Sequence, residues 1–142
     1  MRAASEEVER VSQLLAAGAV PARKLKEAED RLQEAKEAVI LDKLLYGEVK
    51  VEDLTESQAA EMVTVSGRFE QREKIRLDEA AKMVELGMRP KNSLEPFTEG
   101  LARAQRTVAV AKSRASLVEE LVSLVRAEQE AAAHEEIGRA HV

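Results

Sequence analysis

Apolar residues recur at seven-residue intervals along the second half of the chain. One row begins at Leu94, and a second row begins three positions later at Phe97. Two such rows occupy the a and d positions of a heptad repeat that continues for more than five heptads, which is typical of a helix in a coiled coil. The rows are Leu94, Leu101, Val108, Ala115 and Val122, and Phe97, Ala104, Ala111, Val118, Val125 and Ala132. We interpret both rows as buried core.

The first half of the chain has a shorter version of the same pattern. One row contains Leu25, Leu32, Val39 and Tyr46, and the second contains Ala28 and Ala35. Small side chains in one row allow neighbouring helix backbones to approach closely, so we expect slender helix pairs. The pattern predicts a helix over residues 22–46, preceded by a helix over residues 5–17.

An internal repeat with an offset of 69 residues relates the two halves of the chain. Each copy contains a Gly-x-x-Pro turn, with Gly18 and Pro21 in the first copy and Gly87 and Pro90 in the second. Gly supplies the left-handed residue that ends one helix, and Pro is tolerated near the start of the next. Because two long helices joined by so few residues must fold back antiparallel, each copy is predicted to form a helical hairpin.

A capping box at Thr55-Glu56-Ser57-Gln58 predicts the start of a third helix, which we expect to run to about Leu86. Its apolar face contains Ala59, Met62, Ser66, Phe69, Ala80 and Met83. Gly67 falls in the middle of this helix and weakens it by about 1 kcal/mol relative to Ala. In the preceding segment, residues 47–54, Val49 and Val51 alternate with charged residues. This alternation permits a very short strand, although a linker is the favoured interpretation.

The predicted fold class is therefore all-α, with two repeated antiparallel helical hairpins in an elongated coiled-coil bundle. We assign residues 1–46 to the first hairpin, 47–54 to a linker and 55–135 to the second hairpin. Residues 136–142 match one reading frame of a common sequencing adapter, so we expect the natural protein to continue past about residue 135 and His141 to have no function. The first helix is too short to cover the second, which predicts further residues upstream of Met1.

The composition fits long packed helices better than a globular enzyme domain. Apolar residues make up 44% of the chain but aromatic residues only 2%, whereas enzyme cores are usually anchored by bulky aromatic side chains. Two His residues and no Cys leave little material for a transition-metal site. No stretch is apolar for long enough to span a bilayer as a helix.

No group of residues in the sequence indicates catalysis. His134 lies alone in a polar Ala/Glu stretch, and the many carboxylates alternate with Lys and Arg as expected for surface pairs. We therefore predict no catalytic, cofactor-binding or metal site. The net charge is −5, and the basic residues expected on the exposed side of the last helix are not interleaved with aromatic residues, which argues against nucleic-acid binding. Those basic residues are Arg103, Arg106, Lys112 and Arg114.

The two turns contain the candidate docking residues. Basic residues surround each tip, as in any solvated loop, but an exposed tip of this kind is also suited to docking another protein. The candidates are Gly18, Val20, Pro21 and Arg23 in the first tip, and Gly87, Arg89, Pro90 and Lys91 in the second.

The segment from Gly18 to Ala35 reads Gly-Ala-Val-Pro-x-x-x-Leu-x-x-Ala-x-x-x-Leu-x-x-Ala. This pattern resembles the helical hairpin of the TolC family of outer-membrane efflux proteins. The second copy, from Gly87 to Ala104, repeats the Gly, Pro and Leu positions, with Phe97 in place of the first Ala of the helix. In that family, paired hairpins build a periplasmic α-barrel and their tips meet a periplasmic adaptor. Adaptors of the HlyD type carry similar hairpins.

The resemblance implies a non-enzymatic, coiled-coil element of bacterial efflux located in the periplasm or cell envelope, with an adaptor or a second copy as its partner. The family places long membrane strands between its helices, whereas residues 47–54 are too few for one crossing strand of about ten residues and its return. The alternative is therefore a soluble or periplasmic coiled-coil scaffold, or an adaptor-type hairpin, attached to a domain outside this sequence. Without the resemblance, a cytoplasmic location is expected.

Overall fold

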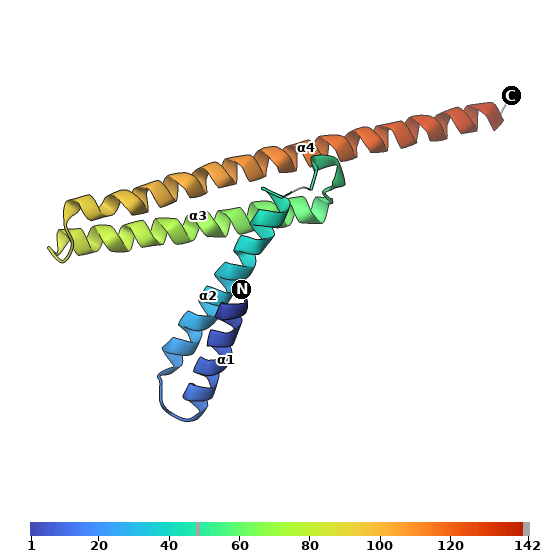
Figure 1. Ribbon diagram of the computed structural model, residues 1–142. Helices are drawn as coiled ribbons and strands as arrows, with labels where there is room; N and C mark the ends of the chain where they lie inside the picture. The colour runs from blue at the N-terminus through green and yellow to red at the C-terminus, as the bar shows by residue number, and fades with distance from the viewer. Residues whose placement is uncertain (48, 141–142) are drawn as a thin grey trace. The chain divides into compact units, whose positions relative to one another are not determined.

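The computed structural model describes residues 1–47 and 49–140. This part of the chain is all-α, with four α-helices, two short 3₁₀ turns and no strand, so the predicted fold class is confirmed (Figure 1). The elements are α1 (Arg2–Ala16), α2 (Ala22–Leu44), η1 (Val51–Asp53), α3 (Glu56–Glu85), η2 (Lys91–Leu94) and α4 (Glu95–Ala140). Glu48 of the predicted linker and His141 and Val142 of the predicted adapter tail lie outside the described residues.

The helices pair as two hairpins, α1 with α2 and α3 with α4. The chain divides into two units, Met1–Gly47 and Glu48–Val142, and each unit contains one hairpin. The helix packing within each hairpin is compatible with a helical bundle.

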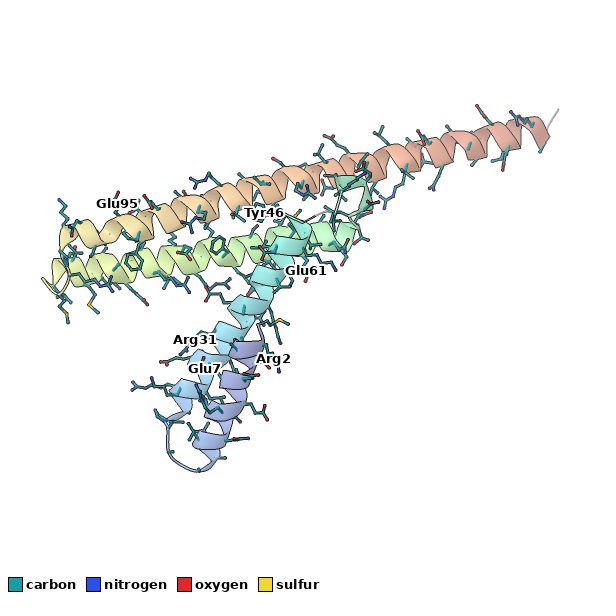
Figure 2. The ribbon with its side chains drawn as sticks, viewed as in Figure 1. Arg2, Glu7, Arg31, Tyr46, Glu61 and Glu95 are labelled. Carbon is teal, nitrogen blue, oxygen red and sulfur yellow. The ribbon has the colours of Figure 1, made fainter. Side chains whose placement is uncertain are left out.

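The first hairpin has a thin core because α1 is shorter than α2. Ala28 is buried, Leu25 and Leu32 are half-buried, and α1 itself has no buried residue. An ion pair of 2.8 Å between a guanidinium nitrogen of Arg31 and a carboxylate oxygen of Glu7 joins the two helices (Figure 2). The pair connects the middle of α1 to the first half of α2.

The predicted seam of α2 extends further than its partner. Val39 remains 49% exposed and Tyr46 remains 64% exposed. Their assignment to the buried core was wrong, because α1 has 15 residues against the 23 of α2 and does not reach them. The heptad pattern identified the correct helix face, but a face is buried only where a second helix lies against it.

In the second hairpin, the predicted seam is the interface between α3 and α4, which lie side by side in Figure 1. Ala104 and Ala111 of α4 are completely buried, and Val118 is 2% exposed. On α3, the predicted face contributes Ala59, Met62, Ser66 and Ala80, all of them buried. The hydroxyl of Ser66 donates to the backbone carbonyl of Val63 at 2.9 Å, so its burial leaves no polar atom unsatisfied. Small side chains on both helices allow the two backbones to approach closely.

The seam of α4 ends where α3 begins. The 46 residues of α4 continue well past the first residue of α3, which has 30 residues (Figure 1). Val125 is 51% exposed and Ala132 is also exposed, so these two predicted core positions were wrong for the same reason as Val39. An ion pair of 3.3 Å between Arg126 and Glu56 joins the two helices close to the end of their overlap.

The start of α3 follows the sequence prediction closely. The hydroxyl oxygen of Thr55 accepts from the backbone amide of Gln58 at 3.0 Å, and the side-chain oxygen of Gln58 accepts from the backbone amide of Thr55 at 3.0 Å. These two hydrogen bonds complete the capping box and satisfy donors that a helix start otherwise leaves unpaired.

The segment that leads to α3 packs on α4 as a 3₁₀ turn, so the short strand that the sequence permitted is not formed in its described residues. Leu54 is 7% exposed. Arg114 donates from its guanidinium to the backbone carbonyl of Val49 at 2.9 Å. The expectation that Arg114 is a solvated surface residue was therefore wrong. It is half-buried and attaches the linker to α4.

Candidate docking site at the hairpin tips

The first tip closes α1 with a Schellman motif. Gly18 has a φ of +74°, which lies in the left-handed region that L side chains rarely adopt. The amide of Ala19 donates to the carbonyl of Leu14 at 2.9 Å, and the amide of Gly18 donates to the carbonyl of Leu15 at 3.0 Å. These two bonds satisfy the last carbonyls of the helix and reverse the direction of the chain.

The second tip repeats this geometry at the positions that the 69-residue offset predicts. Gly87 has a φ of +71°. The amide of Met88 donates to the carbonyl of Met83 at 2.9 Å, and the amide of Gly87 donates to the carbonyl of Val84 at 3.0 Å. The sequence repeat is therefore also a repeat of backbone hydrogen bonds.

Each Pro occupies the N-cap position of the element that follows its tip. Pro21 and Pro90 both have extended backbones, with ψ values of 157° and 150°. The carbonyl of Pro21 accepts from the amide of Lys24 at 3.0 Å, and the carbonyl of Pro90 accepts from the amide of Ser93 at the same distance. The first tip leads directly into α2, whereas the second leads through η2 into α4.

The structure gathers the candidate docking residues at the ends of the two hairpins. In the first tip, Gly18, Pro21 and Arg23 are exposed and Val20 is half-buried. In the second tip, Gly87, Arg89, Pro90 and Lys91 are all exposed. Each set lies in one connection between two helices, and most of its residues are exposed to solvent, where a partner could contact them.

The side chains of the second tip are far more apolar than those of the first. Leu86 is 72% exposed and Met88 is 69% exposed, at positions where the first tip has Ala17 and Ala19. We did not select Leu86 and Met88 from the sequence. The aligned repeat contained the signal, because it shows two large apolar residues replacing Ala at a solvated turn.

Arg89 is held against the hairpin by an aromatic ring. Its guanidinium carbon lies 5.3 Å from the centre of the Phe97 ring, within the range of a cation–π contact. Phe97 is also the residue at which the second copy departs from the repeated pattern. The contact holds the guanidinium against the first turn of α4, whereas Leu86 and Met88 are exposed at the tip itself.

A shallow depression lies directly behind this tip. Its lining contains charged residues of α3 together with the two partners of the cation–π contact. The lining residues are Arg76, Glu79, Ala80, Met83, Arg89 and Phe97. Arg76 donates to a carboxylate oxygen of Glu73 at 2.8 Å within α3. The surface behind the tip is therefore mixed in polarity, whereas Leu86 and Met88 give the tip itself an exposed apolar part.

Among residues 1–47 and 49–140, no group of three or more acidic or His side chains is arranged to hold a metal ion. His134 lies exposed on α4. Within the same residues, no helix combines the length and the apolar character that crossing a membrane requires.

Comparison with known proteins identifies no relative of this chain. No family model matches the chain, no curated protein matches it significantly, and no solved structure matches it significantly.

Proposed function

We propose that this chain is a non-enzymatic coiled-coil docking element and that its second hairpin tip, residues 86–91, binds a protein partner. The observation that carries the proposal is the exposure of Leu86 and Met88, next to Arg89 in the sequence, at the end of the α3–α4 helix pair. An apolar centre with an Arg at its edge is the composition found at the energetic centres of protein interfaces. The Schellman motif fixes the backbone of the tip in advance, which lowers the entropy lost on binding.

The resemblance to the TolC family supports a particular partner. The Gly-x-x-Pro turns and the Leu and Ala spacing that follows them resemble that family's periplasmic hairpins, whose tips meet an adaptor of the HlyD type. We propose such an adaptor hairpin as the partner and the cell envelope as the location. The repeated hydrogen bonds at Gly18 and Gly87 support a shared architecture of the two tips.

The linker favours a second candidate function. Its described residues form a 3₁₀ turn that packs on α4 and is held there by Arg114. A linker of this kind suits a self-contained coiled-coil scaffold or an adaptor-type hairpin that carries another domain. In that case the tips would have no adaptor partner.

Binding to immobilised HlyD-type adaptor hairpins distinguishes the two functions. We expect the full chain to bind and the double variant Leu86→Glu/Met88→Glu to bind at least about tenfold more weakly, because two charges would replace the apolar centre of the tip. The control is Ile75→Glu, which places a charge at another exposed apolar residue of the same hairpin and should bind like the unmodified chain. Equal binding by all three proteins would place the contact away from the tip and contradict the proposed site. No binding by any of them would favour the scaffold.

A further inference from the structure

A second apolar row runs along α4, outside the seam with α3. Its members follow one another in steps of seven, four and three residues, so they share one face of the helix. They are Val110, Leu117, Leu121 and Leu124, which are 43%, 47%, 39% and 62% exposed. The seam residues Ala111 and Val118 lie on a neighbouring face. A helix with two apolar faces has more apolar surface than a two-helix hairpin covers.

The linker turn η1 lies against α4 (Figure 1), and the two elements form a shallow groove over the second half of this row. Val51 and Glu52 form the linker side of the groove. Its α4 side consists of Leu117, Glu120, Leu121 and Leu124. Because Leu54 is buried and Arg114 donates to the carbonyl of Val49, the linker is attached to α4 and gives the groove a defined wall. The three Leu side chains beside this wall remain substantially exposed.

The charges around the groove are predominantly acidic. Among the described residues that line it, the charged ones are Glu52 on the linker side and Glu120 on the α4 side. Both residues are exposed. Residues 49–58 and 116–129, which contain the linker turn and the adjacent part of α4, have two cations against six carboxylates. Their net charge of −4 accounts for most of the −5 of the whole chain, so the negative charge is concentrated around the groove.

The cations of these segments and of the preceding turn of α4 do not neutralise the groove. Arg126 forms an ion pair with Glu56 at 3.3 Å. Arg114 is half-buried and donates to the carbonyl of Val49. Lys50 precedes η1 and does not line the groove. The described lining of the groove therefore combines exposed Leu side chains with carboxylates alone.

From this combination we infer that the groove binds a basic amphipathic helix of another protein. Apolar residues of that helix, spaced by three and four positions, pack against Leu117, Leu121 and Leu124, which have the same spacing. Lys or Arg residues along the edges of its apolar row meet Glu52 on the linker side and Glu120 on the α4 side. An acidic helix would bring like charges together at both edges, which disfavours association. Charge complementarity therefore identifies the class of partner.

The size of the groove limits the strength of the complex. The apolar part from Leu117 to Leu124 spans about 10 Å of helix. One helix face of this length is smaller than a standard stable protein interface. The complex is therefore weak, and its electrostatic part depends on the salt concentration. This inference does not rest on the proposed function, because the groove and the tip at residues 86–91 are separate surfaces.

Fluorescence anisotropy of three labelled synthetic peptides tests the charge of the partner. The peptides share one row of Leu residues at helical spacing and have Lys, Gln or Glu at every polar position. The full chain should bind the Lys peptide at least about tenfold more tightly than the Glu peptide, with the Gln peptide in between. The difference should decrease as the salt concentration is raised. Equal binding of the Lys and Glu peptides, or no binding of the Lys peptide at a chain concentration of about 1 mM, would overturn the inference.

Charge-reversal variants of the full chain locate the binding site. Glu52→Lys/Glu120→Lys should bind the Lys peptide at least about tenfold more weakly and the Glu peptide more tightly, because both edges of the groove become basic. The matched control, Asp78→Lys/Glu99→Lys, makes the same change in net charge at two exposed residues outside the groove and should bind like the unmodified chain. Equal effects of the two variants would show that the peptide responds only to the overall charge, and would contradict the proposed site.

Neutral substitutions test the apolar part of the groove. Leu117→Gln/Leu124→Gln should weaken binding of the Lys peptide by at least about tenfold, because two apolar contacts are lost. The control Leu86→Gln/Met88→Gln changes two exposed apolar residues of the tip and should bind like the unmodified chain. Sedimentation equilibrium of the same proteins tests another occupant. Self-association of the 15.7 kDa chain that is lost in the groove variant alone would make a second copy the occupant and overturn the inference.

Discussion

Three glycines illustrate how the same residue has different consequences at different backbone positions. Gly18 and Gly87 have positive φ and end their helices, whereas Gly67 lies within α3. A Cβ atom added at any of the three would meet no other atom within 4 Å. Space is therefore not what requires glycine at the tips. The requirement comes from the left-handed backbone, which the sequence repeat already indicated.

Replacing these glycines by Ala should change the free energy of unfolding in opposite directions. Gly87→Ala should destabilise the protein by about 1–2 kcal/mol, because an L side chain is disfavoured in the left-handed region. Gly67→Ala is the matched control and should stabilise it by about 1 kcal/mol, because Ala has the higher helix propensity. Urea unfolding followed by circular dichroism measures both changes. The same sign for the two variants would show that the tip tolerates a side chain.

At the scale of the elements, the heptad rows identified which face of each helix faces its partner. They did not show how far along the helix that partner extends. Val118 and Val125 occupy equivalent positions in one row, yet Val118 is 2% exposed and Val125 is 51% exposed. The difference arises because α3 covers only the first part of α4. The capping box at Thr55, by contrast, was predictable in full, since its donors and acceptors lie within four consecutive residues.

The close approach of α3 and α4 should make the seam intolerant of larger side chains. Ala111→Leu should destabilise the second hairpin by about 1–3 kcal/mol, because Ala111 is completely buried and three added carbon atoms would force the helices apart. Ala109→Leu is the control at an exposed position of the same helix and should change the free energy of unfolding by less than about 0.5 kcal/mol. Thermal and urea unfolding provide the measurement. An equal effect of the two variants would argue against a tight seam.

At the scale of the whole molecule, the two units differ in how much core each contains. Residues 48–142 hold the complete α3–α4 seam together with the linker turn. The first unit has 47 residues and contains a helix without a single buried side chain. Chains of this size bury a smaller fraction of their surface than larger domains do and are marginally stable.

The two units should therefore differ in stability when separated. We expect a fragment of residues 48–142 to retain its helix content and to unfold cooperatively. A fragment of residues 1–47 should lose most of its helix content, because a two-helix pair with so thin a core does not offset the entropy of ordering the chain. Far-UV circular dichroism of both fragments during heating checks this expectation. Comparable helix content in the two fragments would contradict it.

Local features of this protein were determined by the sequence alone. The Gly-x-x-Pro turns and the Thr55 capping box act over a few residues, and the heptad rows repeat one local spacing along a helix. Together they define the helices, the tips and the inward face of each helix. Only the tertiary structure decided where each seam ends, that Arg114 attaches the linker to α4, and that a second apolar row on α4 stays exposed. The physical reason is that burial requires a partner surface, and the extent of that surface depends on residues far away in the sequence.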